Sequence, residues 1–269
     1  MAVFGFGAGA RHGVGGGGLR GAVAAEWTKL WSVRSTWWGL ASAVALMAVM
    51  SFTLATSTVS NNTNAVPGDD MGVVSVSGVA VGALDMVQFV VLAMAILVVT
   101  GEYATGSVRA TLQWVPPRGR MLGSKAVVVA AVTFPAGVAL NVVGTVVAGP
   151  VLGRWGRLAA AGFAADALQS GVYLALVSVL ILGVGAMVRS TAVALTTAFL
   201  FLLVVPMLLG GGDESGLPRR VSDALPSSAG RYFMSGDGPY PEVAGLGILV
   251  AWTVAVLCGG VLVLRRRDA

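Results

Sequence analysis

Charged residues are scarce in this sequence: they make up 11% of its 269 residues, against about a quarter in a typical soluble domain. Hydrophobic residues make up 56%, and the mean hydropathy is +0.85. This balance excludes an ordinary soluble enzyme and a disordered, highly charged tail protein. The formal net charge is +5, but the basic residues stand between long apolar runs. We therefore interpret them as determinants of membrane topology and expect no nucleic-acid partner.

Reactive side chains are scarce as well. The single cysteine, Cys258, excludes an intrachain disulfide and a thiolate metal cluster. The single histidine, His12, excludes an HExxH zinc site and disfavours a Ser-His-Asp triad. Neither lysine, Lys29 or Lys125, follows the GxxxxG of a Walker A motif, so we expect no P-loop in this chain. The prediction is a protein without catalytic residues, metal or cofactor of its own, and hence no enzyme.

Long apolar runs, in contrast, are abundant. A helix needs about 20 apolar residues to cross the ~30 Å hydrocarbon core of a bilayer, and six segments qualify: Trp37–Thr56, Val76–Thr100, Lys125–Ala148, Ala167–Val188, Thr191–Leu209 and Val243–Leu264. The predicted fold class is therefore an all-α membrane protein with six transmembrane helices. Residues 1–18 read as a flexible glycine-rich tail and not as a cleaved signal peptide, and residues 19–269 as one transmembrane domain.

The placement of charge predicts the orientation. With six spans both termini lie on one side, and if that side is the cytoplasm, twelve of the 17 basic residues lie inside. The positive-inside rule therefore favours cytoplasmic termini, although Arg154 and Arg157 would then occupy a short outer loop. The arginine-rich, lysine-poor composition is typical of a GC-rich bacterial genome, so we expect a bacterial plasma-membrane protein. The outer segment Gly210–Glu242 is either a plain loop or holds a short helix around Arg219–Leu225.

The segment Leu19–Arg34 is too polar to span the bilayer but carries an apolar stripe. The stripe recurs at helical spacing and consists of Leu19, Val23, Trp27, Leu30 and Trp31, whereas Arg20, Glu26 and Lys29 fall away from it. We predict an amphipathic helix in the cytoplasmic headgroup layer, with Trp27 and Trp31 at the interface and Lys29 and Arg34 near anionic lipid. The alternative is a merely solvated helix beside the membrane.

The predicted inner loop Gly101–Ser124 reads GEYATGSVRATLQWVPPRGRMLGS. Its apolar residues can form one face of a short helix, which the following proline pair ends because proline lacks an N–H donor and clashes with the preceding turn. Arg118 and Arg120 then stand at the membrane edge. Such a helix can dock into a groove of a partner protein. The alternative is a basic loop that only fixes the topology.

Three polar residues stand inside predicted spans. Asp85 and Gln88 are three residues apart and share a helix face, and Asn141 lies in the third span near Pro135. An aspartate at the middle of a bilayer costs on the order of 3 kcal/mol, so such residues are candidates for a translocation path. The alternative is that they hold helices together by hydrogen bonds, which we favour for Gln88 and Asn141. For Asp85 both interpretations stay open.

Three segments resemble a known family: EWTKLWSVRSTWW (Glu26–Trp38), GEYATGSVRATLQWVPPRGRMLGSKA (Gly101–Ala126) and VRSTAVAL (Val188–Leu195). They are similar to the permease subunit of ABC-2 type ABC transporters. The resemblance implies that Leu19–Arg34 is an interfacial connecting helix and that the 101–124 loop contains a cytoplasmic coupling helix. It further implies a contact region for a separate ATPase subunit, formed by Glu102, Tyr103, Gly106 and Arg109, with Arg118 and Arg120 beside it.

By the same resemblance, two permeases (a second copy or a sister chain) and two ATPases form the transporter, which exports a drug, lipid or peptide-like substrate. Asp85 is not part of the family pattern. Two other functions stay open: a proton-coupled secondary transporter that uses Asp85, and a membrane immunity or assembly factor that binds a ligand without transport.

Overall fold

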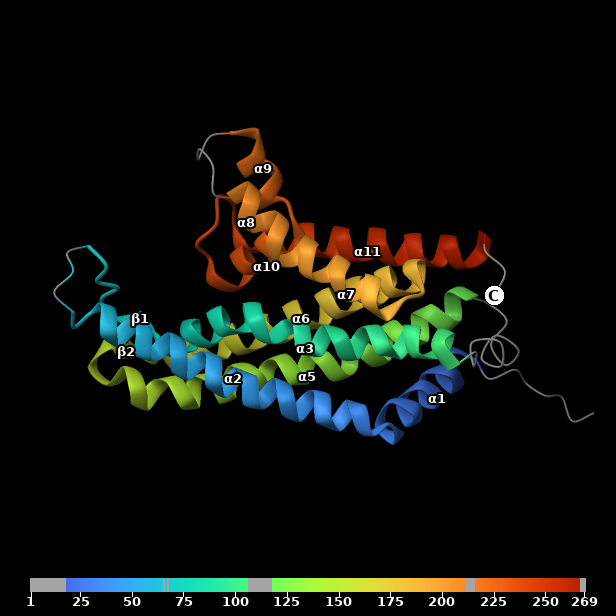
Figure 1. Ribbon diagram of the computed structural model, residues 1–269, viewed down its shortest axis with the longest axis horizontal. Coiled ribbons are helices and arrows are strands. Elements are labelled where there is room, and N and C mark those ends of the chain that lie inside the picture. Colours follow the sequence, from blue (N-terminus) through green and yellow to red (C-terminus); the bar gives the residue numbers. More distant parts are fainter. Residues whose placement is uncertain (1–17, 65, 67, 106–117, 211–215, 267–269) are drawn as a thin grey trace, which may run out of the picture.

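The computed structural model describes residues 18–266 except 65, 67, 106–117 and 211–215 (Figure 1). The described residues are almost entirely helical. In chain order the elements are α1 (Leu19–Ser32), α2 (Arg34–Asn61), β1 (Val74–Ser75), α3 (Val76–Thr105), α5 (Arg118–Leu152), η1 (Gly153–Trp155), β2 (Gly156–Arg157), α6 (Ala160–Val188), α7 (Thr191–Phe199), the π-helix η2 (Leu200–Val204), α8 (Val205–Gly210), α9 (Leu217–Asp223), α10 (Pro226–Ser235) and α11 (Glu242–Arg266). The two short strands pair in parallel and join the loops before α3 and before α6.

Within the described residues, six helical segments are long and apolar enough to cross a membrane, and each contains one predicted span. This confirms the predicted class, an all-α, multi-pass membrane protein. Two helices begin seven residues before the predicted spans: α5 starts at Arg118 instead of Lys125, and α6 at Ala160 instead of Ala167. The apolar run measures only the part of a helix that matches the bilayer. In α5 the additional first turns are held by Met121 and Leu122, which are fully buried in the bundle.

Four long helices, α2, α3, α5 and α6, form the body of the molecule and run side by side (Figure 1). Small residues allow α5 and α6 to approach closely. A Cβ added at Gly137 would lie 2.6 Å from the Ser170 carbonyl oxygen, and one added at Gly171 would lie 2.8 Å from the Phe134 carbonyl oxygen. The fifth and sixth spans flank this body, with α11 packed on α6. Only 17% of the most apolar window of each of these two spans is buried inside the protein, so both leave surface for contacts with lipid or protein.

The predicted tight break between the fourth and fifth spans is present. Arg189 ends α6 in the left-handed conformation (φ 61°), and its N–H donates to the Gly185 carbonyl. Ser190 is extended, and α7 begins directly after it. Two residues therefore reverse the chain between neighbouring spans.

The segment 210–242, predicted to lie outside the cell, is not a plain loop: within its described residues, 217–223 and 226–235 are helical. The short helix expected around Arg219–Leu225 is α9, and a second helix, α10, was not predicted. Proline stands near the start of both helices, where its fixed φ suits the first turn. Helix α10 turns Phe233 and Met234 inward, and the Tyr173 ring of α6 fills the space where Gly230 lacks a side chain.

Candidate functional site

The best-defined polar site is a cluster of four charged side chains at the end of the bundle where α1 begins and α11 ends (Figure 1). We call Glu26, Lys29, Glu102 and Lys125 the ion cluster. Lys125 of α5 lies at its centre and is fully buried. Its Nζ donates to Glu26 Oε2 at 2.7 Å, to Glu102 Oε1 at 2.8 Å and to the Val98 carbonyl at 3.3 Å. Lys29 of α1 donates to the same Glu102 oxygen.

The ion cluster is electrically balanced, with two carboxylates and two ammonium groups. An ammonium has three N–H donors, and all three of Lys125 are used. Burying an unpaired charge costs several kcal/mol, so each member needs the others. The cluster therefore fixes α1 to α3 and α5 at one end of the bundle. Both lysines of the sequence belong to it.

This arrangement shows contacts of α1 that the sequence does not predict. Glu26, predicted to fall away from the apolar stripe, is buried together with Ala22 and the stripe residue Leu30 on the face that contacts the bundle. The ion pair with Lys125 makes this burial favourable. Lys29 was expected near lipid; it pairs with Glu102, while 46% of its side chain stays exposed. Trp27, a member of the stripe predicted to lie at the membrane interface, is 43% exposed.

The tryptophans of this region contact one another. The ring centroids of Trp27 and Trp31 are 5.9 Å apart, with the rings edge to face, and those of Trp31 and Trp37 are 5.0 Å apart. Trp37 Nε1 also donates to the Trp31 carbonyl at 3.3 Å. Arg34, expected at the end of the first helix, is instead the first residue of α2 because the extended Val33 separates the two helices.

The other residues of the predicted contact region lie near the ion cluster in the sequence. Tyr103 lies in the last turn of α3, and Arg118 is the first residue of α5, but both side chains lie outside the described part of the chain. Arg120 is exposed in the first turn of α5. Gly106 and Arg109, and with them the predicted coupling helix, lie outside the described residues. Glu102 and Lys125 thus stand close to the two ends of the undescribed segment 106–117.

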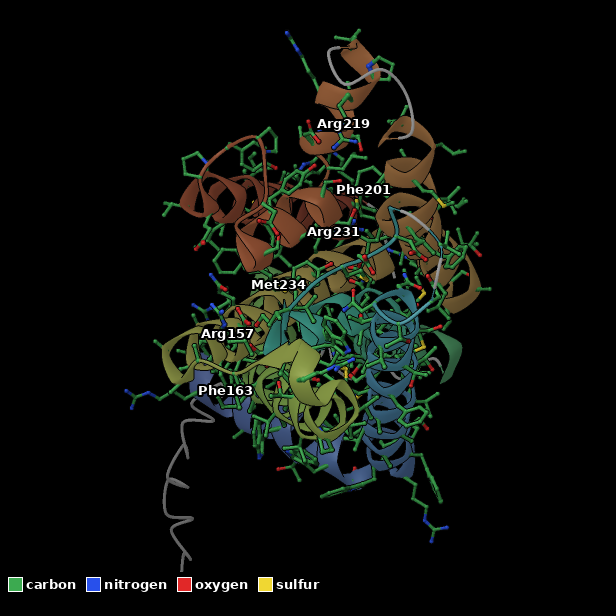
Figure 2. The ribbon with its side chains drawn as sticks, turned by 90° about the vertical axis from the view of Figure 1, so that its left-hand side faces the viewer. Arg157, Phe163, Phe201, Arg219, Arg231 and Met234 are labelled. Carbon is green, nitrogen blue, oxygen red and sulfur yellow. The ribbon has the colours of Figure 1, made fainter. Side chains whose placement is uncertain are left out.

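A second group of polar residues lies within the spans, around Asp85. Gln88 Nε2 donates to the Asp85 carbonyl at 2.9 Å, and Gln88 Oε1 accepts from the Tyr173 hydroxyl of α6 at 2.7 Å. The Asp85 carboxylate pairs with Arg231 of α10 at 3.2 Å. Arg231 lies at the border between α10 and the helices below it (Figure 2). The structure thus brings Asp85 and Gln88 together.

Asn141 belongs to a different contact. Its Nδ2 donates to Ser170 Oγ at 3.2 Å, and its Oδ1 accepts from Thr145 at 3.5 Å. Both Asn141 and Ser170 are buried between α5 and α6, where the helices approach closely. This bonding agrees with the interpretation of Asn141 as a residue that joins two helices.

Two tyrosines hold the folded outer segment together. The hydroxyls of Tyr232 and Tyr240 donate to Asp223, the first to its carboxylate at 2.7 Å and the second to its carbonyl at 2.5 Å. Burial raises the pKa of Tyr240 to about 12, and the nearby Tyr232 and Asp223 add to the rise. Burial and the hydrogen bond with Asp223 also raise the pKa of Tyr232.

In the ion cluster and the Asp85 group, four residues were missed by reasoning on the sequence: Glu26, Lys125, Tyr173 and Arg231. For Lys125 a signal was available, since it stands directly before the apolar run AVVVAAV and is one of only two lysines. For Arg231 there was none, because only folding of α10 against α3 reveals its partner. No group of three or more His, Cys, Asp and Glu side chains able to hold a metal occurs among the described residues.

No protein-family model matches the sequence, and no curated protein matches it.

Proposed function

We propose that this chain is the membrane-spanning permease subunit of an ATP-driven transporter of the ABC-2 type, powered by a separate ATPase subunit. The observation that carries the proposal is the buried ion cluster. It joins α1, α3 and α5 beside the two ends of segment 106–117, the segment that resembles a coupling region. A push on that segment would therefore reach three helices at once.

The proposed orientation places the ion cluster at the cytoplasmic face of the bacterial plasma membrane, with both termini inside. It is supported by the basic residues around the cluster end, among them Arg120, Arg265 and Arg266. The chain carries no Walker A sequence, so the energy must come from a partner. A second permease, identical or a sister chain, completes the transporter and uses exposed surface of the flanking helices.

The proposed mechanism is rigid-body motion. ATP-driven closure of the ATPases displaces segment 106–117, and the buried charges transmit the displacement because separating them would expose unpaired charge in the bundle. Helices α3 and α5 continue without a break to the opposite end of the molecule (Figure 1). The two permeases thereby alternate between inward-open and outward-open states.

Purification from native membranes tests the proposal. A tagged wild-type chain should co-purify with a P-loop ATPase whose hydrolysis is measured directly in the complex. The variant Arg109→Glu should still insert in the membrane but should co-purify with much less of the ATPase subunit. The matched variant Arg154→Glu changes an arginine at the opposite end of the molecule and should co-purify with the ATPase subunit as the wild type does. The proposal is wrong if no ATPase co-purifies, or if both variants retain it equally.

A second candidate, a proton-coupled transporter, is favoured by one observation, the Asp85 carboxylate within a span. Reconstitution of the purified chain alone in proteoliposomes separates the two: uptake driven by a proton gradient without ATP, lost in Asp85→Asn, would favour this candidate. Ligand binding with neither transport nor an ATPase would favour an immunity or assembly factor.

A further inference from the structure

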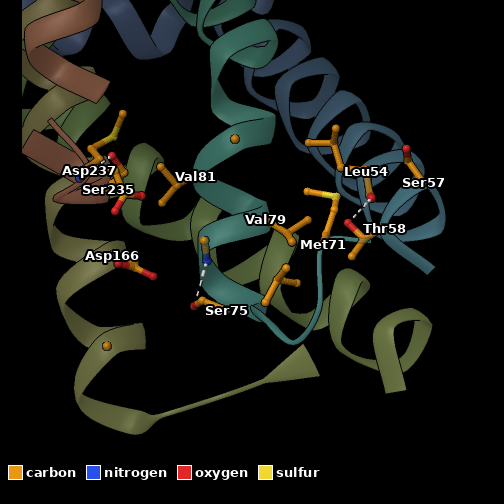
Figure 3. A pocket seen from close by; sticks show the side chains of 15 residues that line it. Leu54, Ser57, Thr58, Met71, Ser75, Val79, Val81, Asp166, Ser235 and Asp237 are labelled. Atoms are coloured by element: carbon orange, nitrogen blue, oxygen red, sulfur yellow. Dashed lines mark hydrogen bonds between the residues drawn. The ribbon is translucent and has the colours of Figure 1, made fainter. Parts of the chain in front are cut away.

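A cavity with polar residues in its wall lies at the end of the bundle opposite the ion cluster. We call it the outer pocket. Its volume is about 630 Å³, within the range of about 300–1,000 Å³ typical of small-molecule sites. Its walls come from the end of α2, the start of α3, the start of α6 and the end of α10 (Figure 3). Four elements distant in sequence thus meet around one space.

The two sides of the outer pocket differ in chemistry. Leu54, Met71 and Val79 form an apolar side, on α2, in the loop before β1 and on α3, whereas Asp166 and Asp237 stand on the other side, on α6 and after α10 (Figure 3). No lysine, arginine or histidine is among the described residues that line it. A ligand that satisfies both sides needs an apolar body and a positive charge.

The carboxylates are available to such a ligand. Neither the Asp166 nor the Asp237 side chain forms an ion pair or a hydrogen bond with the described residues. The nearest arginine of α10, Arg231, is engaged by Asp85. The first turn of α3, which could otherwise attract an anion, is capped because Ser75 Oγ accepts from the Gly78 N–H at 3.2 Å. The electrostatics of the pocket therefore favour a cation.

We propose that the outer pocket binds an organic cation with an apolar body. This assignment names the substrate class of the permease and in that respect rests on the proposed function. The apolar side binds the body by excluding water, and the two aspartates hold the charge at the pocket rim. An organic anion of the same shape would meet the two aspartates and no cationic side chain among the described residues that line the pocket.

Binding of tetraphenylphosphonium to the full chain in phosphatidylcholine nanodiscs tests the proposal, with tetraphenylborate as an anion of nearly the same shape. The cation should bind saturably, and the anion should not. The isosteric double variant Asp166→Asn/Asp237→Asn should weaken binding of the cation by about tenfold or more. Because this variant preserves shape, a loss of binding reports on charge.

A second variant tests the location. A Cβ added at Gly162, which lines the pocket, would meet no atom within 4 Å, so the position has room for a side chain that takes up part of the cavity. Gly162→Leu should weaken binding, whereas Gly247→Leu, at an equally open glycine of α11, should not. Unchanged binding in both pocket variants, or saturable binding of tetraphenylborate, would overturn the proposal. Since no ATPase is present in this experiment, such a result leaves the co-purification test of the permease function standing.

Discussion

At the scale of single residues, Lys125 is the charge on which the most contacts depend. It is fully buried and joins Glu26, Glu102 and the Val98 carbonyl. Removal of one partner of a buried pair leaves the other charged and desolvated, at a cost of about 3–5 kcal/mol. Lys29 is different because nearly half of its side chain is in contact with solvent or headgroups.

We therefore expect Lys125→Met to lower the free energy of unfolding by about 3–5 kcal/mol, measured by denaturant titration in detergent micelles. Lys29→Met, the matched control at the exposed edge of the ion cluster, should cost about 1 kcal/mol or less. The triple variant Lys125→Met/Glu26→Gln/Glu102→Gln should recover part of the loss because no buried charge remains unpaired. Equal effects of the two single variants would show that the cluster does not depend on burial.

Tyr240 gives the outer segment a pH dependence. An unfolded tyrosine ionises near pH 10, whereas folded Tyr240 keeps its proton until about pH 12. The contribution of Tyr240 to the free energy of unfolding is therefore complete below pH 10. It is lost as the pH rises toward 12, because between these values only the unfolded tyrosine ionises.

Hydrogen exchange of α9 and α10 should accordingly lose protection between about pH 10 and 12, and this loss should be smaller in Tyr240→Phe. The variant also lacks the hydrogen bond to the Asp223 carbonyl, so its protection at neutral pH should already be lower. A pH profile identical to that of the wild type would contradict the pKa assignment.

At the scale of elements, the position of α10 depends on the absence of a side chain at Gly230. A Cβ at this position would lie 2.1 Å from Cε2 of the Tyr173 ring, so the helix cannot stay where it is with any larger residue. Movement of α10 would also separate Arg231 from Asp85. The contact between α10 and α6 thus controls the only described ion pair of the Asp85 group.

Gly230→Ala should therefore lower stability by about 1–3 kcal/mol, a cost typical of overpacking, in thermal unfolding of the purified protein. Gly247→Ala, at an open helical position, should leave the stability unchanged or slightly higher. If Gly230→Ala is as stable as the wild type, α10 is not seated on Tyr173 as described.

The elements also show how far the sequence alone leads. The six spans are predictable because the bilayer demands about 20 apolar residues in each, and this signal needs no tertiary information. The burial of Glu26 in α1 was not predictable, because a carboxylate counts as a surface residue until its partner Lys125, distant in sequence, is known. Helix α10 was missed for a similar reason: its residues are half polar, and its burial depends on α6 and α11.

At the scale of the whole molecule, α3 and α5 connect two ends with different chemistry. Glu102 and Lys125 place the ion cluster at one end, and the first turns of α3 line the outer pocket at the other. The Asp85 group lies between them on α3. A displacement of α3 at the ion-cluster end would also move the residues of α3 that line the outer pocket. The proposed ATP-driven transport requires such mechanical coupling between the two ends.

The most direct test of this account is site-specific photo-cross-linking in living cells. A benzophenone amino acid at Gln113, within the segment that the ATPase is proposed to grip, should cross-link to a P-loop ATPase. The same amino acid at Asp70, exposed at the opposite end, should not. Absence of an ATPase from the Gln113 product, or its presence in the Asp70 product, would contradict the central claim that an ATPase drives this membrane protein from the ion-cluster end.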